Sequence, residues 1–252
     1  MELNVISFNI RCCDDKDGNS IAERAPRLHK IMSSYDPDVV CIQEFRPSWD
    51  EYFKKYFLCD YEMYNQYRTS TGKLESSPIL WKKDKFVCEK RGTFWLSDTP
   101  EVESRGWDEK YDTNRICSYV ILKEKKSGKI FAFMNTHFGF GDNCQTKSAK
   151  LICEYSKSIS DYPTFCTGDF NMTKNSAGYK EITKYFTDAN AVTANDYGAT
   201  YHAYDPEKHN SEHIDFCFVD KATKPLTYKI IRDKVDGKFP SDHYGIEIKL
   251  EI

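Results

Sequence analysis

A carboxylate and an amide follow an apolar segment in the middle of the chain. Phe165 to Asn171 reads F-C-T-G-D-F-N, and the two-residue period of a strand places Asp169 and Asn171 on the same side. Gly168 lets the backbone turn closely at this point. A carboxylate here can orient or deprotonate a water molecule, and an amide can donate to that water or to a developing oxyanion. The alternative is an Asx turn that leaves the strand.

An imidazole stands at the end of a second apolar segment. Asn135 and His137 alternate in M-N-T-H-F, so both side chains are expected to leave the sheet together. This makes Asn135 a candidate for substrate binding. His137 has the side chain best suited to acid–base chemistry near neutral pH, and a structural histidine is the alternative.

Glu44 closes a short apolar run, Asp38 to Ile42, that is typical of a strand covered on both faces. An unpaired carboxylate beside such a strand would cost several kcal/mol in desolvation. A hard cation such as Mg²⁺ would relieve that cost. The alternative is a salt bridge, with Arg46 or Arg11 as the partner.

Two further segments combine a carboxylate with an imidazole. Ser241–Asp242–His243 comes directly before the last predicted strand, and His213–Ile214–Asp215 begins another. A carboxylate beside an imidazole fixes its tautomer and stabilises its cation, as acid–base chemistry on phosphate or acyl groups requires. Neither carboxylate–imidazole pair alone is specific for a catalytic site. The joint occurrence of five segments with polar residues at a strand end is stronger evidence for one.

The elements that must position these residues alternate between strand and helix. Leu3 to Ile10 alternates as a strand that ends near Asn9, and Glu23 to Tyr35 has helical periodicity behind a possible capping box at Ser20 and Glu23. Further strands are predicted at Ser77–Trp81, Cys117–Leu122, Ile130–Thr136, Pro163–Thr167, Ile214–Val219 and Tyr244–Leu250, and further helices at Lys147–Ile159 and Tyr179–Phe186. Many strands with few helices favour an α+β fold of stacked sheets flanked by helices.

The composition is that of a globular protein. The 252 residues include 36 basic and 39 acidic side chains, so a net charge of -3 argues against a global polyanion-binding surface. Ten cysteines without a C-x-x-C pair favour buried free thiols over disulfides or zinc. The apolar runs are too short for a membrane helix and no secretion signal is evident, so we expect a cytoplasmic monomer with one domain over residues 1–252 and no obligate protein partner.

The order of these motifs resembles the endonuclease/exonuclease/phosphatase superfamily over essentially the whole chain. The motifs are S-F-N-I, I-Q-E, N-T-H, G-D-F-N, H-I-D-F and S-D-H-Y. Gly92 to Glu101 also looks like the F-W-L-S-x-T-P segment of a bacterial subgroup. The superfamily includes deoxyribonucleases, abasic-site endonucleases, deadenylases, sphingomyelinases and inositol polyphosphate 5-phosphatases. The resemblance implies a four-layer α/β sandwich of two mixed β-sheets and a Mg²⁺ or Mn²⁺ cofactor.

The resemblance also assigns the metal and the attacking water. It implies that Asn9 and Glu44 help to hold the metal, with Asp242 as an additional ligand. Asp169 would orient or activate the attacking water, and Asn171 would bind that water or a non-bridging oxygen.

The remaining roles fall on the histidines and their partners. His137 would contact the scissile phosphate or assist the leaving group, and His243 would stabilise the phosphorane-like transition state. Asp215 would orient a histidine, and Glu75 is a candidate to orient His243. Arg115 is a candidate phosphate contact, with a surface arginine as the alternative.

Three positions depart from the family pattern. Gly139 lacks the side chain that members of the subgroup often carry in L-D-H after N-T-H. His213 stands where many members have arginine, and Gly245 replaces a frequent proline. The last two flank the proposed catalytic groups, so we expect them to be tolerated.

The residues that select the substrate are expected to lie in four loops: Thr69–Ser76, Val102–Asn114, Phe138–Thr146 and Tyr197–Ser211. The aromatic residues of these loops either stack on bases or pack the loops; they are Trp107, Tyr111, Phe140 and Tyr204.

Three hypotheses for the function stay open. A metal-dependent phosphodiesterase or nuclease is favoured by the complete set of polar strand ends. A phosphatase of a small metabolite or lipid headgroup would need several Arg or Lys beside Arg115. A non-catalytic binding module is disfavoured because Asp169 and both histidines are present.

Overall fold

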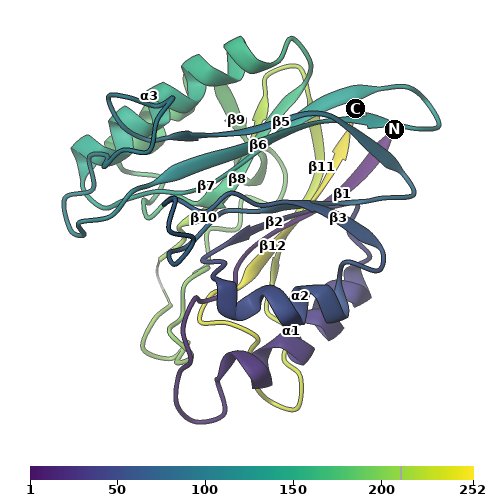
Figure 1. The fold of residues 1–252 in the computed structure, drawn as a ribbon, viewed down its shortest axis with the longest axis vertical. Helices are drawn as coiled ribbons and strands as arrows, with labels where there is room; N and C mark the ends of the chain where they lie inside the picture. Colours follow the sequence, from purple (N-terminus) through teal and green to yellow (C-terminus); the bar gives the residue numbers. More distant parts are fainter. Residues whose placement is uncertain (211) are drawn as a thin grey trace.

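The computed structural model describes residues 1–210 and 212–252 and consists of two six-stranded sheets packed face to face (Figure 1). The strands are β1 (Glu2–Asn9), β2 (Val39–Gln43), β3 (Tyr61–Tyr64), β4 (Ile79–Lys82), β5 (Phe86–Trp95), β6 (Ile116–Glu124), β7 (Ile130–His137), β8 (Thr164–Asp169), β9 (Phe186–Asp188), β10 (Asp215–Asp220), β11 (Lys224–Ile231) and β12 (Gly245–Glu251). The first sheet has the order β11-β12-β1-β2-β4-β3 and the second β5-β6-β7-β8-β10-β9. The β1–β2 and β7–β8 pairs are parallel and the other pairs antiparallel, which confirms the prediction of two mixed sheets.

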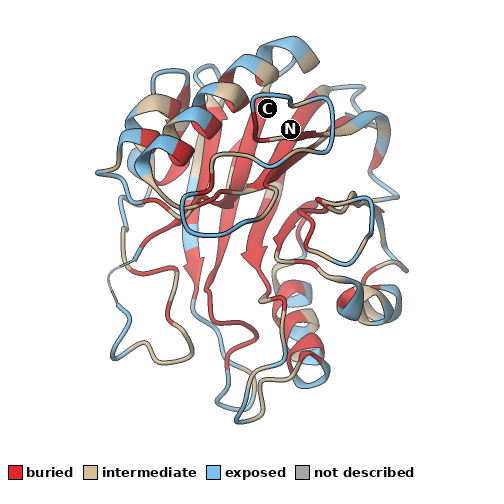
Figure 2. Cartoon of the chain, turned by 60° about the vertical axis from the view of Figure 1, so that its left-hand side comes forward, coloured by how far each residue is buried: buried red, intermediate tan, exposed pale blue. Residues whose placement is uncertain are grey.

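Strand alternation divides the apolar side chains between two layers of core. In β1, Leu3 and Val5 point into the core between the sheets, whereas Ile6 and Phe8 point to the helix-covered face. Both faces of the strand are therefore buried, as Figure 2 shows for the central strands. This two-sided burial explains why the sequence of the central strands is nearly continuously apolar.

Helices cover the outer face of each sheet (Figure 1). The first sheet carries α1 (Ile21–Tyr35), the 3₁₀ turn η1 (Pro47–Trp49) and α2 (Asp50–Tyr56), and the second carries α3 (Asp142–Ile159) and α4 (Ala177–Ile182), with the one-turn helix α5 (Ala189–Val192) following β9. The Glu23 carboxylate accepts the backbone N–H of Ser20 at 3.1 Å, in agreement with the predicted cap. Asp36, at φ 47°, ends α1.

The predicted helix Tyr179–Phe186 is wrong at its C-terminal end. The helix stops at Ile182, and Phe186 begins the edge strand β9, which pairs with β10. Phe186 and Ile182 both pack into the same apolar cluster, so their spacing satisfied a helical pattern although the chain changes direction between them. The third helix also begins earlier than predicted, at Asp142.

Strand register brings the polar strand ends to one edge of the stacked sheets. In the parallel pairs, Asn9 lies beside Gln43, and His137 lies beside Asp169. In the antiparallel β8–β10 pair, Asp169 lies opposite Asp215. Residues far apart in the sequence therefore meet at this edge.

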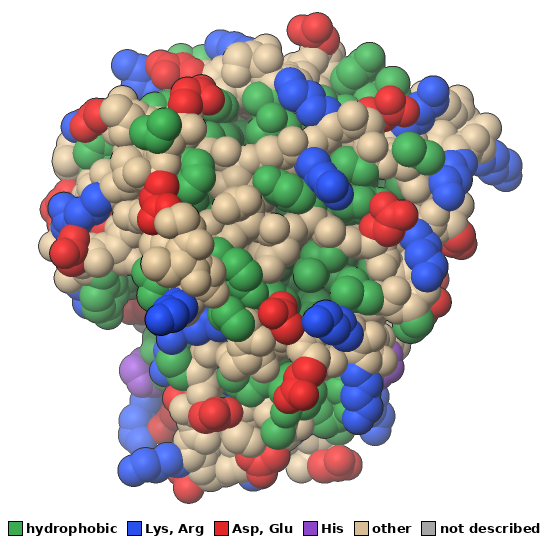
Figure 3. All heavy atoms as spheres, in the orientation of Figure 1, with side chains coloured by type: hydrophobic (Ala, Val, Ile, Leu, Met, Phe, Trp, Pro, Cys, Tyr) green, Lys and Arg blue, Asp and Glu red, His purple; other side chains and the backbone are tan. Residues whose placement is uncertain are grey.

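The remaining features agree with the composition. The ten cysteines are free, and most of them are buried. Acidic and basic side chains are interspersed over the face drawn in Figure 3. Within the described residues, no helix combines the length and apolar character needed to cross a membrane.

Candidate active site

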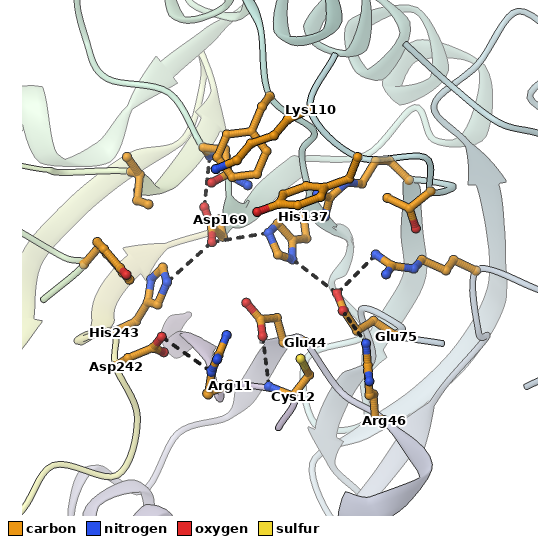
Figure 4. Close-up of a pocket in the computed structure, with 18 of the residues that line it drawn as sticks. Arg11, Cys12, Glu44, Arg46, Glu75, Lys110, His137, Asp169, Asp242 and His243 are labelled. Atoms are coloured by element: carbon orange, nitrogen blue, oxygen red, sulfur yellow. Dashed lines mark hydrogen bonds and ion pairs between the residues drawn. The ribbon is translucent and has the colours of Figure 1, made fainter. Parts of the chain in front are cut away.

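The polar strand ends surround a cavity of about 700 Å³. Its walls come from both sheets and from all four loops that the sequence associates with substrate choice (Figure 4). The lining residues are Arg11, Cys12, Glu44, Arg46, Arg68, Glu75, Lys110, Tyr111, Asp112, Thr113, Arg115, His137, Phe140, Asp169, Asn171, Tyr201, Glu212, Ile214, Asp242 and His243. The fourth loop, Tyr197–Ser211, contributes Tyr201, and its last residue, Ser211, lies outside the described residues.

Asp169 lines this cavity at the end of β8. A Cβ on Gly168 would lie 2.1 Å from the backbone oxygen of Thr136, so only glycine lets β8 approach β7 this closely. The Asx turn is present, because the backbone N–H of Asn171 donates to Asp169 Oδ1 at 2.9 Å. The other carboxylate oxygen, Oδ2, accepts from Asn9 Nδ2 at 3.0 Å. Oδ1 therefore closes the turn, whereas Oδ2 faces the other polar side chains of the site.

The environment of Asp169 raises its pKa into the neutral range. Burial and the nearby Asp215 carboxylate raise the pKa of Asp169, His243 lowers it, and the net result is a pKa of about 7. A carboxylate with such a pKa can hold or release a proton close to neutral pH. This is the range in which a general base for water is most effective.

His137 lies at the end of β7 and separates two carboxylates. Its Nε2 is 3.5 Å from Asp169 Oδ2, and its Nδ1 is 3.9 Å from Glu75 Oε2. Burial lowers the pKa of His137 well below its ordinary value, and Arg115 adds to this effect. His137 is therefore a neutral imidazole.

His243 has the opposite character. Its Nδ1 lies 3.0 Å from Asp215 Oδ2, and its Nε2 lies 3.7 Å from Asp169 Oδ2. Burial by itself would lower the pKa of His243, but the charge and hydrogen bond of Asp215 outweigh it and raise the pKa to about 10. The residue is a buried imidazolium held by two carboxylates, and the partner at its Nδ1 is Asp215 instead of the expected Glu75.

The Glu75 carboxylate lies instead against two arginines. Its Oε1 is 3.3 Å from Arg46 Nη2, and its Oε2 is 3.1 Å from Arg68 Nη1. The expectation that Glu75 orients His243 is therefore wrong. Glu75 adjoins the other histidine, His137.

The expected metal ligands converge from three strands. Glu44, at φ 60° just after β2, accepts Asn9 Nδ2 at 3.0 Å through Oε1 and the backbone N–H of Cys12 at 2.9 Å through Oε2. Burial would raise the pKa of Glu44, but the hydrogen bonds from the Cys12 N–H and Asn9 and the charge of His243 lower it below its ordinary value, so Glu44 is ionised. Asp242 also lines the cavity; burial raises its pKa, as does the charge of Glu44.

This donor set fits a hard divalent cation. Amide and carboxylate oxygens are the ligands that Mg²⁺ and Mn²⁺ prefer, and a cation would relieve the repulsion between Glu44 and Asp242. A second group, Asp169, Asp215 and His243, also brings its ligand atoms within 4.8 Å of one another. In that second group the hydrogen bond between Asp215 and His243 already uses Nδ1 of the imidazole, so Asn9, Glu44 and Asp242 remain the candidate ligands.

Of the two candidate substrate contacts, Arg115 reaches the cavity and Asn135 does not. Arg115 is 5% exposed and lines the cavity, so the alternative of a surface arginine is wrong. Asn135 is fully buried between the sheets, where Nδ2 donates to Ile42 O at 2.7 Å and Pro78 O at 2.9 Å and Oδ1 accepts from Gln43 Nε2 at 2.7 Å. Its amide joins the two sheets, and we remove it from the substrate-binding set.

Several cavity residues had no motif to mark them. Arg46, Arg68 and Lys110 add cations beside Arg115, and Tyr201 packs its ring 5.0 Å from that of His243. They occupy loops without a local pattern. Their only sequence signal is that they lie within or beside loops that follow the marked strands.

The glycine at position 139 is compensated from another loop. A Cβ on Gly139 would lie 2.8 Å from atoms of the Asp108 side chain. Asp108 Oδ2 accepts Arg115 Nε at 3.0 Å, and Oδ1 accepts the backbone N–H groups of Lys110 at 3.0 Å and Tyr111 at 3.1 Å. The missing side chain thus makes room for a carboxylate that orients Arg115 and the loop after it.

The other two departures are accommodated locally. His213 is buried and bonds Gly198 O at 2.9 Å and the Tyr228 hydroxyl at 3.2 Å. A Cβ on Gly245 would lie 2.6 Å from the Phe8 ring, so glycine lets that ring pack against β12. Neither residue lines the cavity.

Comparison with known proteins gives the family to which this fold belongs. Residues 6–243 match the model of the Endonuclease/Exonuclease/phosphatase family, and the chain belongs to this family. Its relatives named below as a phosphatase and a phosphodiesterase are phosphoester hydrolases, and enzymes of the family generally use divalent metals.

Solved structures of two bacterial members are similar over nearly their whole length. A family protein from Bacteroides vulgatus is 30% identical, with 100% of this chain and 99% of that chain covered and a TM-score of 0.89. The mannosyl-6-phosphatase Bt3783 of Bacteroides thetaiotaomicron is 27% identical, with 99% and 100% covered and a TM-score of 0.89.

Among curated proteins, mouse tyrosyl-DNA phosphodiesterase 2 is 24% identical over 99% of this chain and 66% of its own length. An uncharacterised mimivirus protein, L388, is 27% identical over 59% of this chain and 58% of its own length. The chain therefore spans less than two thirds of each of these two relatives.

Proposed function

We propose that this protein hydrolyses a phosphoester by direct attack of water with the help of a divalent metal. The observation that carries the proposal is the position of Asp169 Oδ2, 3.5 Å from one imidazole, 3.7 Å from another and hydrogen-bonded to Asn9. A neutral histidine, a cationic histidine and a carboxylate of near-neutral pKa thus face one point. In-line attack on phosphorus needs such a convergence of donors and a base.

Each group has a defined task. The Asp169 carboxylate accepts a proton from water as the new oxygen–phosphorus bond forms and the ester bond breaks. The His243 cation stabilises negative charge on the equatorial oxygens, His137 faces the leaving oxygen, and the Asn171 amide lies beside the attacking water. Mg²⁺ or Mn²⁺ at Asn9, Glu44 and Asp242 would supply Lewis-acid stabilisation of the phosphate.

The cavity favours a small phosphorylated molecule as the substrate. The phosphatase hypothesis requires several cations beside Arg115, and Arg46, Arg68 and Lys110 line the same cavity. A terminal phosphate exposes more charge to such cations than a diester does. The similarity to a mannosyl-6-phosphatase also supports this substrate class.

A phosphodiesterase or nuclease is the second candidate, because aromatic rings stand at the cavity wall. Tyr111 and Phe140 both line the cavity, with ring centroids 5.5 Å apart, and Tyr111 is 48% exposed. Exposed rings of this kind can stack on bases.

The test measures hydrolysis of 4-nitrophenyl phosphate, bis(4-nitrophenyl) phosphate, hexose phosphates and plasmid DNA, each with Mg²⁺, Mn²⁺ or EDTA. We expect metal-dependent release of phosphate from the monoesters, and loss of that activity in Asp169→Ala and His243→Ala with folding intact. Asp161→Ala, at an exposed position, is the matched control. Near-wild-type turnover in either active-site variant would refute the mechanism, and cleavage of the diester or DNA alone would select the second candidate.

A further inference from the structure

Three guanidinium groups gather at one end of the cavity. Arg46 and Arg68 both contact Glu75, and Arg115 lines the same wall. Figure 4 shows Glu75 and Arg46 across the cavity from Asp242 and His243, with His137 between the two sides. The cavity therefore has an end with the expected metal ligands and a basic end, separated by one imidazole ring.

These arginines retain unused hydrogen-bonding capacity. A guanidinium carries five N–H donors. Among the described side chains, Arg46 and Arg68 each donate one hydrogen bond to Glu75, and Arg115 donates one to Asp108. Arg68 and Arg115 are only 7% and 5% exposed, and the Nε atom of Arg68 is buried with no partner among the described residues.

The local charge is also unbalanced. Three guanidinium groups face the two carboxylates of Glu75 and Asp108, and Lys110 adds a further cation at the wall. Burial lowers the pKa of Arg68, and the like charges of Arg115 and Arg46 lower it further despite Glu75. Buried cations with open donors are stabilised when an anion pairs with them.

We propose that Arg46, Arg68 and Arg115 form a second anion subsite, which binds a phosphate group of the substrate other than the one that is hydrolysed. The preferred substrate is then a small molecule with two phosphates, one at the metal end and one at the basic end. The identity of this substrate rests on the proposed function, whereas the subsite itself is a binding property. His137 faces Asp169 with Nε2 and Glu75 with Nδ1, so the two phosphates lie on opposite sides of its ring.

The test measures binding without turnover. The Asp169→Asn variant is titrated by calorimetry, in the presence of Mg²⁺, with glucose 1,6-bisphosphate against glucose 6-phosphate and with 2,3-bisphosphoglycerate against 3-phosphoglycerate. The two pairs sample a long and a short separation between phosphates. We expect the bisphosphate to bind about tenfold tighter or more in at least one pair, because charge-assisted hydrogen bonds contribute on this scale.

Variants then locate the preference. Arg68→Met keeps much of the apolar stem and is expected to abolish the preference for the bisphosphate. If this variant with its buried substitution fails to fold, Arg46→Met, at a partly exposed position, replaces it and is expected to have the same effect. Arg91→Met removes an exposed cation of β5 and should leave the preference unchanged. Equal affinity within both pairs, or an equal loss for mono- and bisphosphate in the variants, would overturn the proposal. A retained binding preference without hydrolysis of any phosphoester by the unmodified protein would instead refute only the proposed function.

Discussion

Asp169 and Asp215 lie directly opposite each other in the antiparallel pairing of β8 and β10, and both carboxylates face His243. Two buried carboxylates this close would repel each other without a cation between them. The imidazolium of His243 provides that charge, with Nδ1 3.0 Å from Asp215 and Nε2 3.7 Å from Asp169. The charge state of each member of this group therefore depends on the others.

Replacing Asp215 by Asn should neutralise His243. Without the Asp215 charge, burial dominates and the pKa of His243 falls from about 10, so the imidazole loses its proton near neutral pH. We expect kcat to fall by about 10²–10⁴-fold. The change in protonation is measured by NMR titration of the His243 ring, and a His243 that stays cationic at neutral pH in the variant would contradict this account.

Replacing Glu44 by Gln should raise the metal requirement. The ionised carboxylate of Glu44 is the proposed anionic ligand beside Asn9, so its removal weakens the site. The Mg²⁺ concentration for half-maximal activity should rise by about 10- to 100-fold. Glu62→Gln, at an exposed position of β3, is the control. An unchanged Mg²⁺ titration would remove Glu44 from the ligand set.

Replacing Asn135 by Ala should affect stability more than catalysis. The variant leaves the buried Ile42 O, Pro78 O and Gln43 Nε2 without their partner. The free energy of unfolding should fall by about 2–3 kcal/mol, measured by denaturant titration. Asn143→Ala, on the exposed side of α3, should change it little. Loss of kcat in an Asn135 variant that remains folded would restore this residue to the site.

Replacing Gly139 by Ala should displace Asp108. The added Cβ would lie 2.8 Å from the Asp108 side chain and separate it from Arg115. Overpacking of this kind costs about 1–3 kcal/mol of stability, and we expect kcat/KM to fall because Arg115 loses its orientation. The double variant Gly139→Ala/Asp108→Ala removes the overlap but leaves the buried Arg115 without its carboxylate partner, so neither stability nor activity should return to the level of the unmodified protein. Full recovery of both would show that Asp108 has no orienting role.

The buried ring of His202 should make stability depend on pH. Burial lowers its pKa from 6.5 to about 4, and the nearby His243 charge contributes. The unfolded chain therefore binds a proton first as the pH falls, so the contribution of His202 is fully present above pH about 6.5 and is lost progressively down to about 4. The loss amounts to about 3 kcal/mol. NMR titration should show a neutral His202 at pH 5, and a cationic ring at that pH would disprove the assignment.

Much of the site was predictable because its residues follow local rules. Asp169 and His137 each end an apolar strand, Glu44 directly follows one, and strand alternation predicts the face on which each side chain lies. The order of the motifs was sufficient to indicate the family. The wrong end of the helix at Phe186 shows the limit of periodicity, since a strand and a helix can both deliver an apolar residue to the same cluster.

The amino-acid sequence by itself indicated the family through the order of its motifs, and that resemblance implied the two mixed sheets. Alternation located the polar strand ends, because it acts within a few positions of the chain. Only the tertiary structure decided the rest. Asn135 and His137 share a face of β7. His137 ends the strand and lines the cavity, whereas Asn135, two residues closer to the strand centre, lies between the sheets. Arg46 and Arg68 reach Glu75 from loops, and their meeting depends on how the sheets and loops pack, which no local pattern encodes.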